Sequence, residues 1–211
     1  MVITCPIRFR QDWIITDHAA SFFFAEGVKW TSLTEVRLND ATGKPAGSID
    51  VVLVAYDDAG KVVDFGALEI QAVYISGNVR EPFEYYISSR KRLVPQLVYK
   101  GGILHSWNKK IAVALNRTFF ATLPTLKQVP KDQADIAWLV YDLKIHADDN
   151  HKPGRYYLTK VDEIFTDFES ALLSITTPLP GQIGDFIKLL QEKLDEHLEN
   201  PPTNQTMERP F

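Results

Sequence analysis

Residues 48–75 read SIDVVLVAYDDAGKVVDFGALEIQAVYI, and this stretch is the most informative about the fold. Two runs rich in β-branched residues, 48–56 and 61–75, predict two long strands. The sequence DDAG between them (57–60) consists of residues that are common in tight turns and tolerate positive φ angles. We therefore predict a β-hairpin. Both runs are apolar on both faces, which is typical of central strands in a covered sheet.

The hairpin brings polar residues together on one face. An even-length connection pairs Tyr56 with Lys61, so that the numbers of paired residues sum to 117. Glu69 then lies diagonally across from Asp50, and Gln71 follows on the same face because residues i and i+2 of a strand point the same way. An odd-length turn without a bulge would instead place the two carboxylates on opposite faces.

Two carboxylates in otherwise apolar strands need an explanation. Burying each of them costs several kcal/mol unless it finds a partner, and the nearest partner of Asp50 is Glu69. A divalent cation removes the repulsion between them, and carboxylate oxygens are ligands that suit Mg2+. The alternatives are a cluster neutralised by a neighbouring arginine, or a hairpin with one hydrated face.

Other segments predict a layered fold of strands and helices. Further β-branched runs indicate strands at 111–115, 136–145 and 155–160. Apolar residues at helical spacing indicate helices at 17–26, 86–100, 162–175 and 185–198. Strands and helices in mixed order are typical of an α/β or α+β layer fold. We expect one domain over residues 1–199 and a flexible tail at 200–211, where prolines stand among polar residues.

The composition excludes several classes of protein. The chain has 211 residues, of which 45% are hydrophobic and 24% charged, and no apolar run approaches the roughly 20 residues of a membrane span. Cys5 is the only cysteine, which excludes an internal disulfide framework and any metal site built from several thiolates of one chain. Neither a Walker loop nor a dinucleotide-binding fingerprint is present. Without a signal peptide pattern at the N-terminus, we expect a cytoplasmic location.

Positive charge is concentrated in residues 80–110. The net charge of the chain is -4, but this stretch holds seven basic residues against two acidic ones. Such a run is most often a solvated face. Beside a site that acts on phosphates, it would serve to bind nucleic acid.

Several short stretches around the hairpin resemble the catalytic part of the NotI-like restriction endonucleases. These stretches are GSID (47–50), LEIQAVYISG (68–77), SSRKRL (88–93) and YKGGIL (99–104). The similarity runs from about Cys5 to about Leu115. Asp50 followed by Glu69-Ile70-Gln71 also resembles the signature of the PD-(D/E)XK nuclease superfamily, in the variant with glutamine in place of lysine. The resemblance implies a restriction-endonuclease-like core with a central mixed β-sheet flanked by helices.

The resemblance also implies roles for particular residues. Asp50 and Glu69 would be metal ligands, with the main-chain carbonyl of Ile70 as a third ligand for Mg2+, for which Mn2+ could substitute. Gln71 would occupy the place of the lysine that orients the attacking water. Glu35 matches the upstream acidic residue of such sites. The reaction would be hydrolysis of a phosphodiester in double-stranded DNA.

Partners follow from the same resemblance. Arg90, Lys91, Arg92 and Lys100 would contact DNA phosphates. We expect a homodimer, because cutting both strands of a symmetric site favours two-fold pairing of active sites. NotI-like enzymes carry an additional N-terminal region with a four-cysteine metal site, which a chain with only Cys5 does not match. The alternative is therefore a non-catalytic remnant that acts as a DNA-binding or structural module.

Overall fold

A computed structural model describes residues 3, 6–72, 93–145, 154–177 and 182–199 of the chain. Contacts divide the chain into two compact units, Met1–Thr176 and Thr177–Phe211. The predicted domain over 1–199 and the predicted tail stay predictions.

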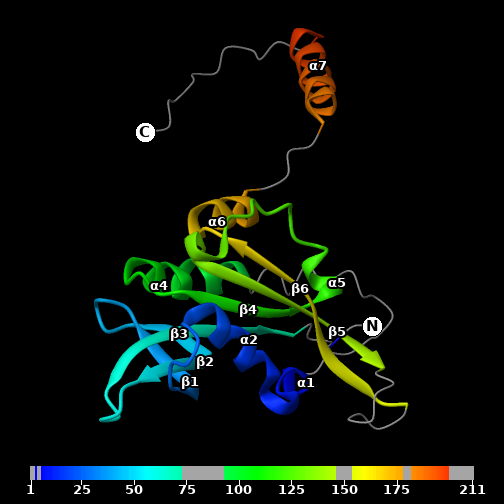
Figure 1. Ribbon diagram of the computed structural model, residues 1–211. Coiled ribbons are helices and arrows are strands. Elements are labelled where there is room, and N and C mark those ends of the chain that lie inside the picture. The colour runs from blue at the N-terminus through cyan, green and yellow to red at the C-terminus, as the bar shows by residue number, and fades with distance from the viewer. Residues whose placement is uncertain (1–2, 4–5, 73–92, 146–153, 178–181, 200–211) are drawn as a thin grey trace. The chain divides into compact units, whose positions relative to one another are not determined.

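The first unit is built around a six-stranded mixed sheet in the order β1-β2-β3-β4-β5-β6 (Figure 1). Antiparallel pairing joins β1 to β2, β2 to β3 and β5 to β6, whereas β4 pairs in parallel with both β3 and β5. The strands are β1 (Trp30–Asn39), β2 (Pro45–Tyr56), β3 (Val62–Gln71), β4 (Ile111–Asn116), β5 (Ile136–Ile145) and β6 (Tyr156–Thr166). All six residues of β4 are buried, as expected of a strand in the middle of a covered sheet.

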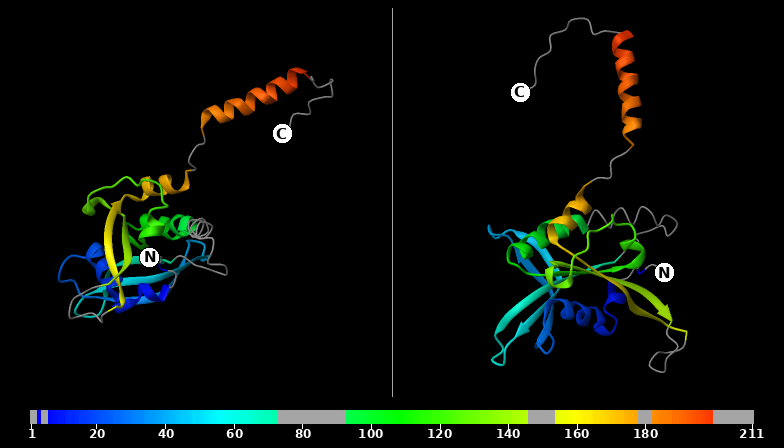
Figure 2. Two further views of the ribbon diagram at one scale, coloured as in Figure 1. Left: turned by 90° about the vertical axis from the view of Figure 1, so that its right-hand side faces the viewer. Right: turned by 45° about the horizontal axis from the view of Figure 1, so that its top comes forward.

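Helices cover both faces of this sheet, and each face has its own apolar core (Figures 1 and 2). On one face lie α1 (Pro6–Phe9), the short 3-10 helix η1 (Gln11–Trp13) and α2 (Ile14–Phe23). The other face carries helical residues 93–96, the π-helix η2 (Leu97–Gly101), α4 (Gly102–Ser106) and α6 (Phe168–Thr176). The chain also forms the short helices α5 (Arg117–Phe120) and η3 (Lys131–Gln133). The predicted α/β fold with a mixed sheet between helices is confirmed.

The hairpin forms, but its register differs from the predicted one. Val52 pairs with Ala67, so the numbers of paired residues sum to 119 rather than 117. The difference arises at the turn, where the register shifts between Ala55 and Tyr56. Beyond this irregularity, Asp57 closes a longer loop, in which its carboxylate accepts the main-chain N–H of Lys61. The shift is by two, so the face of every residue in β3 is preserved.

Two other predictions need correction. Residues 162–166 were expected to begin a helix, but they are the end of β6, and the helix α6 begins only at Phe168. The ladder with β5 continues to the Ile136–Thr166 pair and holds these residues in the sheet. The strand β1 was not predicted, because most of its side chains are exposed, as is usual for an edge strand, and its apolar pattern is weak.

The second unit contains one described helix, α7 (Ile183–Glu199). The predicted amphipathic helix at 185–198 is therefore confirmed. Its large apolar side chains are exposed, and those of Phe186 and Leu198 are more than half exposed.

Candidate active site

Asp50 and Glu69 stand together on the two central strands of the hairpin. The pairs Val51–Leu68 and Val52–Ala67 set a register whose next rung brings Asp50 opposite Glu69. The two carboxylates are thus direct rather than diagonal neighbours. The half-buried Asp50 carboxylate accepts the main-chain N–H of Ile70 at 2.7 Å, which fixes it to the edge of β3.

Glu69 is paired with a lysine that comes from another part of the chain. Lys100 donates its Nζ to Glu69 Oε2 at 2.6 Å and to the main-chain oxygen of Ser48 at 2.8 Å. The side chains of Lys100 and Glu69 are only 6% and 3% exposed. Lys100 thereby bridges β2 and β3 from the π-helix η2. Gly47, whose φ of 127° favours glycine, lies beside the lysine stem.

The environment of Glu69 changes its protonation. Burial raises the pKa of Glu69 to about 7, and the nearby charge of Asp50 adds to this rise, whereas the Lys100 ammonium opposes it. Burial outweighs the ion pair, so the carboxyl group exists in both protonated and ionised forms near neutral pH. The second oxygen, Glu69 Oε1, is buried and has no hydrogen-bond partner among the described residues.

Gln71 and Ile70 complete the motif in β3. Gln71 is buried and lies two positions after Glu69, on the same face of the strand. Ile70 points to the opposite face, where it packs against the core under α2. The role of its main-chain carbonyl as a metal ligand stays a prediction.

Glu35 lies at the same level of the sheet, on the neighbouring edge strand. The pairs Thr34–Val51 and Val36–Ile49 flank it and place it across from Asp50. Its φ of 57° is a left-handed conformation that costs a non-glycine residue about 1–3 kcal/mol. The side chain is exposed. Its backbone position therefore agrees with a place beside the two carboxylates.

Of the four residues predicted to contact DNA, the structure describes one. Arg90, Lys91 and Arg92 lie outside the described residues. Lys100 is described, and its ammonium points into the carboxylate pair instead of onto an open surface. Sequence reasoning missed this ion pair, since 31 residues separate Lys100 from Glu69 and only tertiary packing joins them.

Neither a preformed cluster of metal ligands nor a membrane-spanning helix is found in the described residues. There, no group of three or more histidine, cysteine, aspartate or glutamate side chains is placed to hold a metal ion. Likewise, none of the helices in the described ranges has the length and apolar character needed to cross a membrane.

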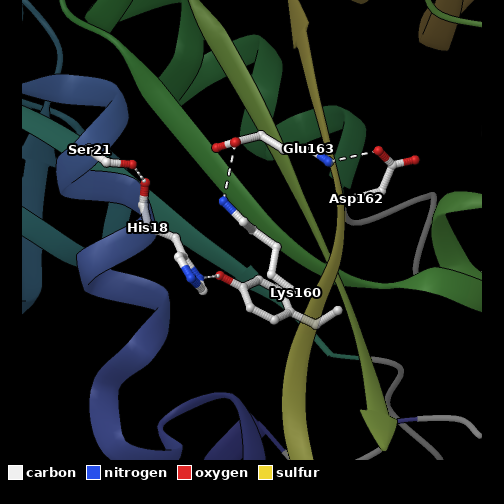
Figure 3. A network of polar contacts seen from close by, with 6 residues as sticks. His18, Ser21, Lys160, Asp162 and Glu163 are labelled. Carbon is white, nitrogen blue, oxygen red and sulfur yellow. Dashed lines mark hydrogen bonds and ion pairs between the residues drawn. The ribbon is translucent and has the colours of Figure 1, made fainter.

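A second polar cluster lies on the other face of the sheet (Figure 3). His18 of α2 places Nδ1 2.9 Å from the hydroxyl of Tyr141 in β5. Lys160 donates to Glu163 at 3.1 Å within β6. Burial, followed by the nearby Lys160 charge, lowers the pKa of His18 and so favours the neutral ring. The contact between His18 and Tyr141 attaches α2 to the sheet, and we interpret the cluster as structural.

The fold and the carboxylate pair together define a class of protein. A mixed sheet with helices on both faces, and acidic residues on adjacent central strands, is consistent with a restriction-endonuclease-like core. The family described as restriction endonuclease NotI matches residues 1–87 and 80–158, which is well over half of the chain. The chain therefore belongs to the NotI restriction endonuclease family. No curated protein matches it significantly. Membership in this family supports the interpretation that the protein is a nuclease and binds DNA.

Proposed function

We propose that this protein is a Mg2+-dependent endonuclease of the PD-(D/E)XK type that hydrolyses phosphodiester bonds of double-stranded DNA. The observation that carries the proposal is the half-buried Asp50 beside the buried Glu69 on adjacent strands, in a chain of the NotI family. Gln71 and Glu35 are the further residues of the site.

The residues fit a divalent cation. Glu69 Oε1 is a buried acceptor without a donor among the described residues, which is costly unless something occupies it. The Asp50 carboxylate beside it adds negative charge, which raises the pKa of Glu69. Asp50 and Glu69 would hold the ion, together with the carbonyl of Ile70. When bound, Mg2+ supplies a Lewis acid that activates water and offsets charge on the phosphate.

The chain's own residues organise the site around that ion. The N–H of Ile70 orients the Asp50 carboxylate. Gln71 is an amide, which can orient a water molecule by hydrogen bonding but carries no charge at any pH in the working range. Glu35 can approach from β1, because its exposed side chain is free of the packed core.

DNA binding would use the basic stretch that follows Glu69 in the sequence. We assign Arg90, Lys91 and Arg92 as phosphate contacts, because the region from 80 to 110 is strongly basic in an otherwise acidic chain. A homodimer would place two such sites on the two strands of a symmetric sequence.

A cleavage assay tests the proposal directly. The wild type should cut supercoiled plasmid in Mg2+ and not in EDTA. Asp50→Asn should lower the cleavage rate by about three orders of magnitude, since it removes a charged ligand. Asp58→Asn is the matched control, because Asp58 lies in the turn of the same hairpin and its side chain is 91% exposed. Equal activity of Asp50→Asn and Asp58→Asn would refute the assignment.

A further inference from the structure

Lys100 is an unusual residue in this protein because it is charged and nearly fully buried. It lies in η2, a five-residue π-helical segment, and the residue is 4% exposed. Short π-helical insertions often occur at functional sites, where they redirect a side chain. Burying an ammonium costs several kcal/mol unless it is paired and hydrogen-bonded, so its partners explain its place.

Those partners lie on both strands of the hairpin. The Lys100 ammonium contacts Glu69 Oε2 on β3 and the Ser48 carbonyl on β2. The contact occupies Oε2 of the Glu69 carboxylate, and Oε1 has no hydrogen-bond donor among the described residues. Lys100 thus holds the carboxylate by one oxygen, while the Asp50 side chain lies close enough to affect its protonation.

We propose that Lys100 is a positioning residue of the metal site, which anchors Glu69 through Oε2 so that Oε1 is presented to the cation. This inference rests on the proposed function, and it assigns to Lys100 a role different from direct phosphate contact. It also places a positive charge at the carboxylates, where Gln71 supplies none. The positive charge at the site therefore comes from Lys100 in η2, and not from the position of Gln71 in β3.

The geometry favours this role over the two simpler ones. A phosphate contact requires an accessible ammonium, whereas Lys100 is buried and directed inward. A purely structural ion pair would not explain why Asp50 stands directly across from Glu69 on the neighbouring strand, since the two carboxylates repel each other unless a cation lies between them. Partners that hold a metal ligand in place typically affect metal affinity by about 10–100-fold when they are removed.

Calorimetric titration of the DNA-free full chain with Mn2+ tests the inference. Lys100→Met should weaken Mn2+ affinity by about 10–100-fold. The salt dependence of DNA binding, measured without metal, should stay at the wild-type slope. Lys109→Met is the matched control, because it removes a lysine of the same basic stretch that pairs with Asp64 instead. This control should bind Mn2+ as the wild type does.

Wild-type Mn2+ affinity in a folded Lys100→Met protein would overturn the inference. If the salt slope of DNA binding also fell by about 1, Lys100 would be a phosphate contact. If circular dichroism shows that Lys100→Met does not fold, Lys100→Gln replaces it, since the amide keeps a donor for Glu69. That variant should weaken Mn2+ affinity several-fold, and unchanged affinity would again overturn the inference.

The outcome is separable from that of the proposed function. Calorimetry uses no DNA, so a loss of Mn2+ affinity in Lys100→Met would support the positioning role even if the wild type failed to cut plasmid. Conversely, a wild type that cuts DNA while Lys100→Met binds Mn2+ normally would refute only the role of Lys100.

Discussion

Two glutamate–lysine pairs lie on opposite faces of the same sheet, and they differ in burial and in neighbours. Glu69 and Lys100 are nearly inaccessible, whereas the side chains of Glu163 and Lys160 are each 25% exposed. Both glutamates keep an Oε1 atom without a hydrogen-bond partner among the described residues. Asp50 lies across from Glu69, and its negative charge adds to the rise in the Glu69 pKa. The carboxylate of Asp162, next to Glu163 in the chain, accepts the main-chain N–H of Glu163. The ion pair alone therefore does not mark a site, and we base the proposal on the facing carboxylates of Asp50 and Glu69.

The largest expected difference between the two pairs is in catalysis. Glu69→Gln should reduce Mg2+-dependent plasmid cleavage about a thousandfold, because it removes a charged ligand. Glu163→Gln makes the same chemical change in the structural cluster and should leave the cleavage rate within about twofold of the wild type. A comparable loss in both variants would show that Glu69 acts only through stability.

A second difference is expected in the pH dependence of stability without metal. The pKa of Glu69 is about 7 in the folded protein, above the ordinary value of 4.5. Its contribution to stability is complete below pH 4.5 and is lost as the pH rises through 7, because the folded state then has to bury a charge. Relative to Glu69→Gln, the wild type should lose up to about 3 kcal/mol of unfolding free energy over this range.

Urea unfolding in EDTA at pH 5 and pH 8 measures this effect. Glu163→Gln should follow the wild-type pH dependence. If the wild type and Glu69→Gln change in parallel between the two pH values, the buried carboxyl group is not the one that titrates near 7.

The smallest effect is expected from the cluster around α2. Tyr141→Phe removes the hydroxyl that contacts His18 and should lower the free energy of unfolding by about 1 kcal/mol. The cleavage rate should not change, because this contact lies on the face away from Asp50 and Glu69. A fall in cleavage rate without a fall in stability would place the α2 cluster in the catalytic machinery.

The sequence was sufficient to predict the hairpin and the convergence of its polar residues. The alternation of β3 determines which face Glu69 and Gln71 share, and this holds although the register was wrong by two. The register itself depends on the irregularity at Ala55 and Tyr56, which leaves no trace in the hydrophobic pattern.

Other features depend on tertiary contacts and could not be predicted locally. Residues 162–166 have apolar side chains at a spacing that suits a helix, but pairing with β5 holds them in a strand. The edge strand β1 lacks a clear apolar face and could not be predicted. Glu35 was therefore predicted as a site residue from the family resemblance alone. Lys100 contacts Glu69 only because η2 packs on the hairpin. The sequence showed Lys100 only as one member of a basic stretch.

We propose that Asp50 and Glu69 share a divalent cation. This can be tested by calorimetric titration of the metal-free wild type with Mn2+, beside Asp50→Asn and the turn control Asp58→Asn. We predict that the wild type and Asp58→Asn bind Mn2+ with equal affinity and that folded Asp50→Asn shows no measurable binding. Equal Mn2+ affinity in all three proteins would show that the two carboxylates do not share an ion.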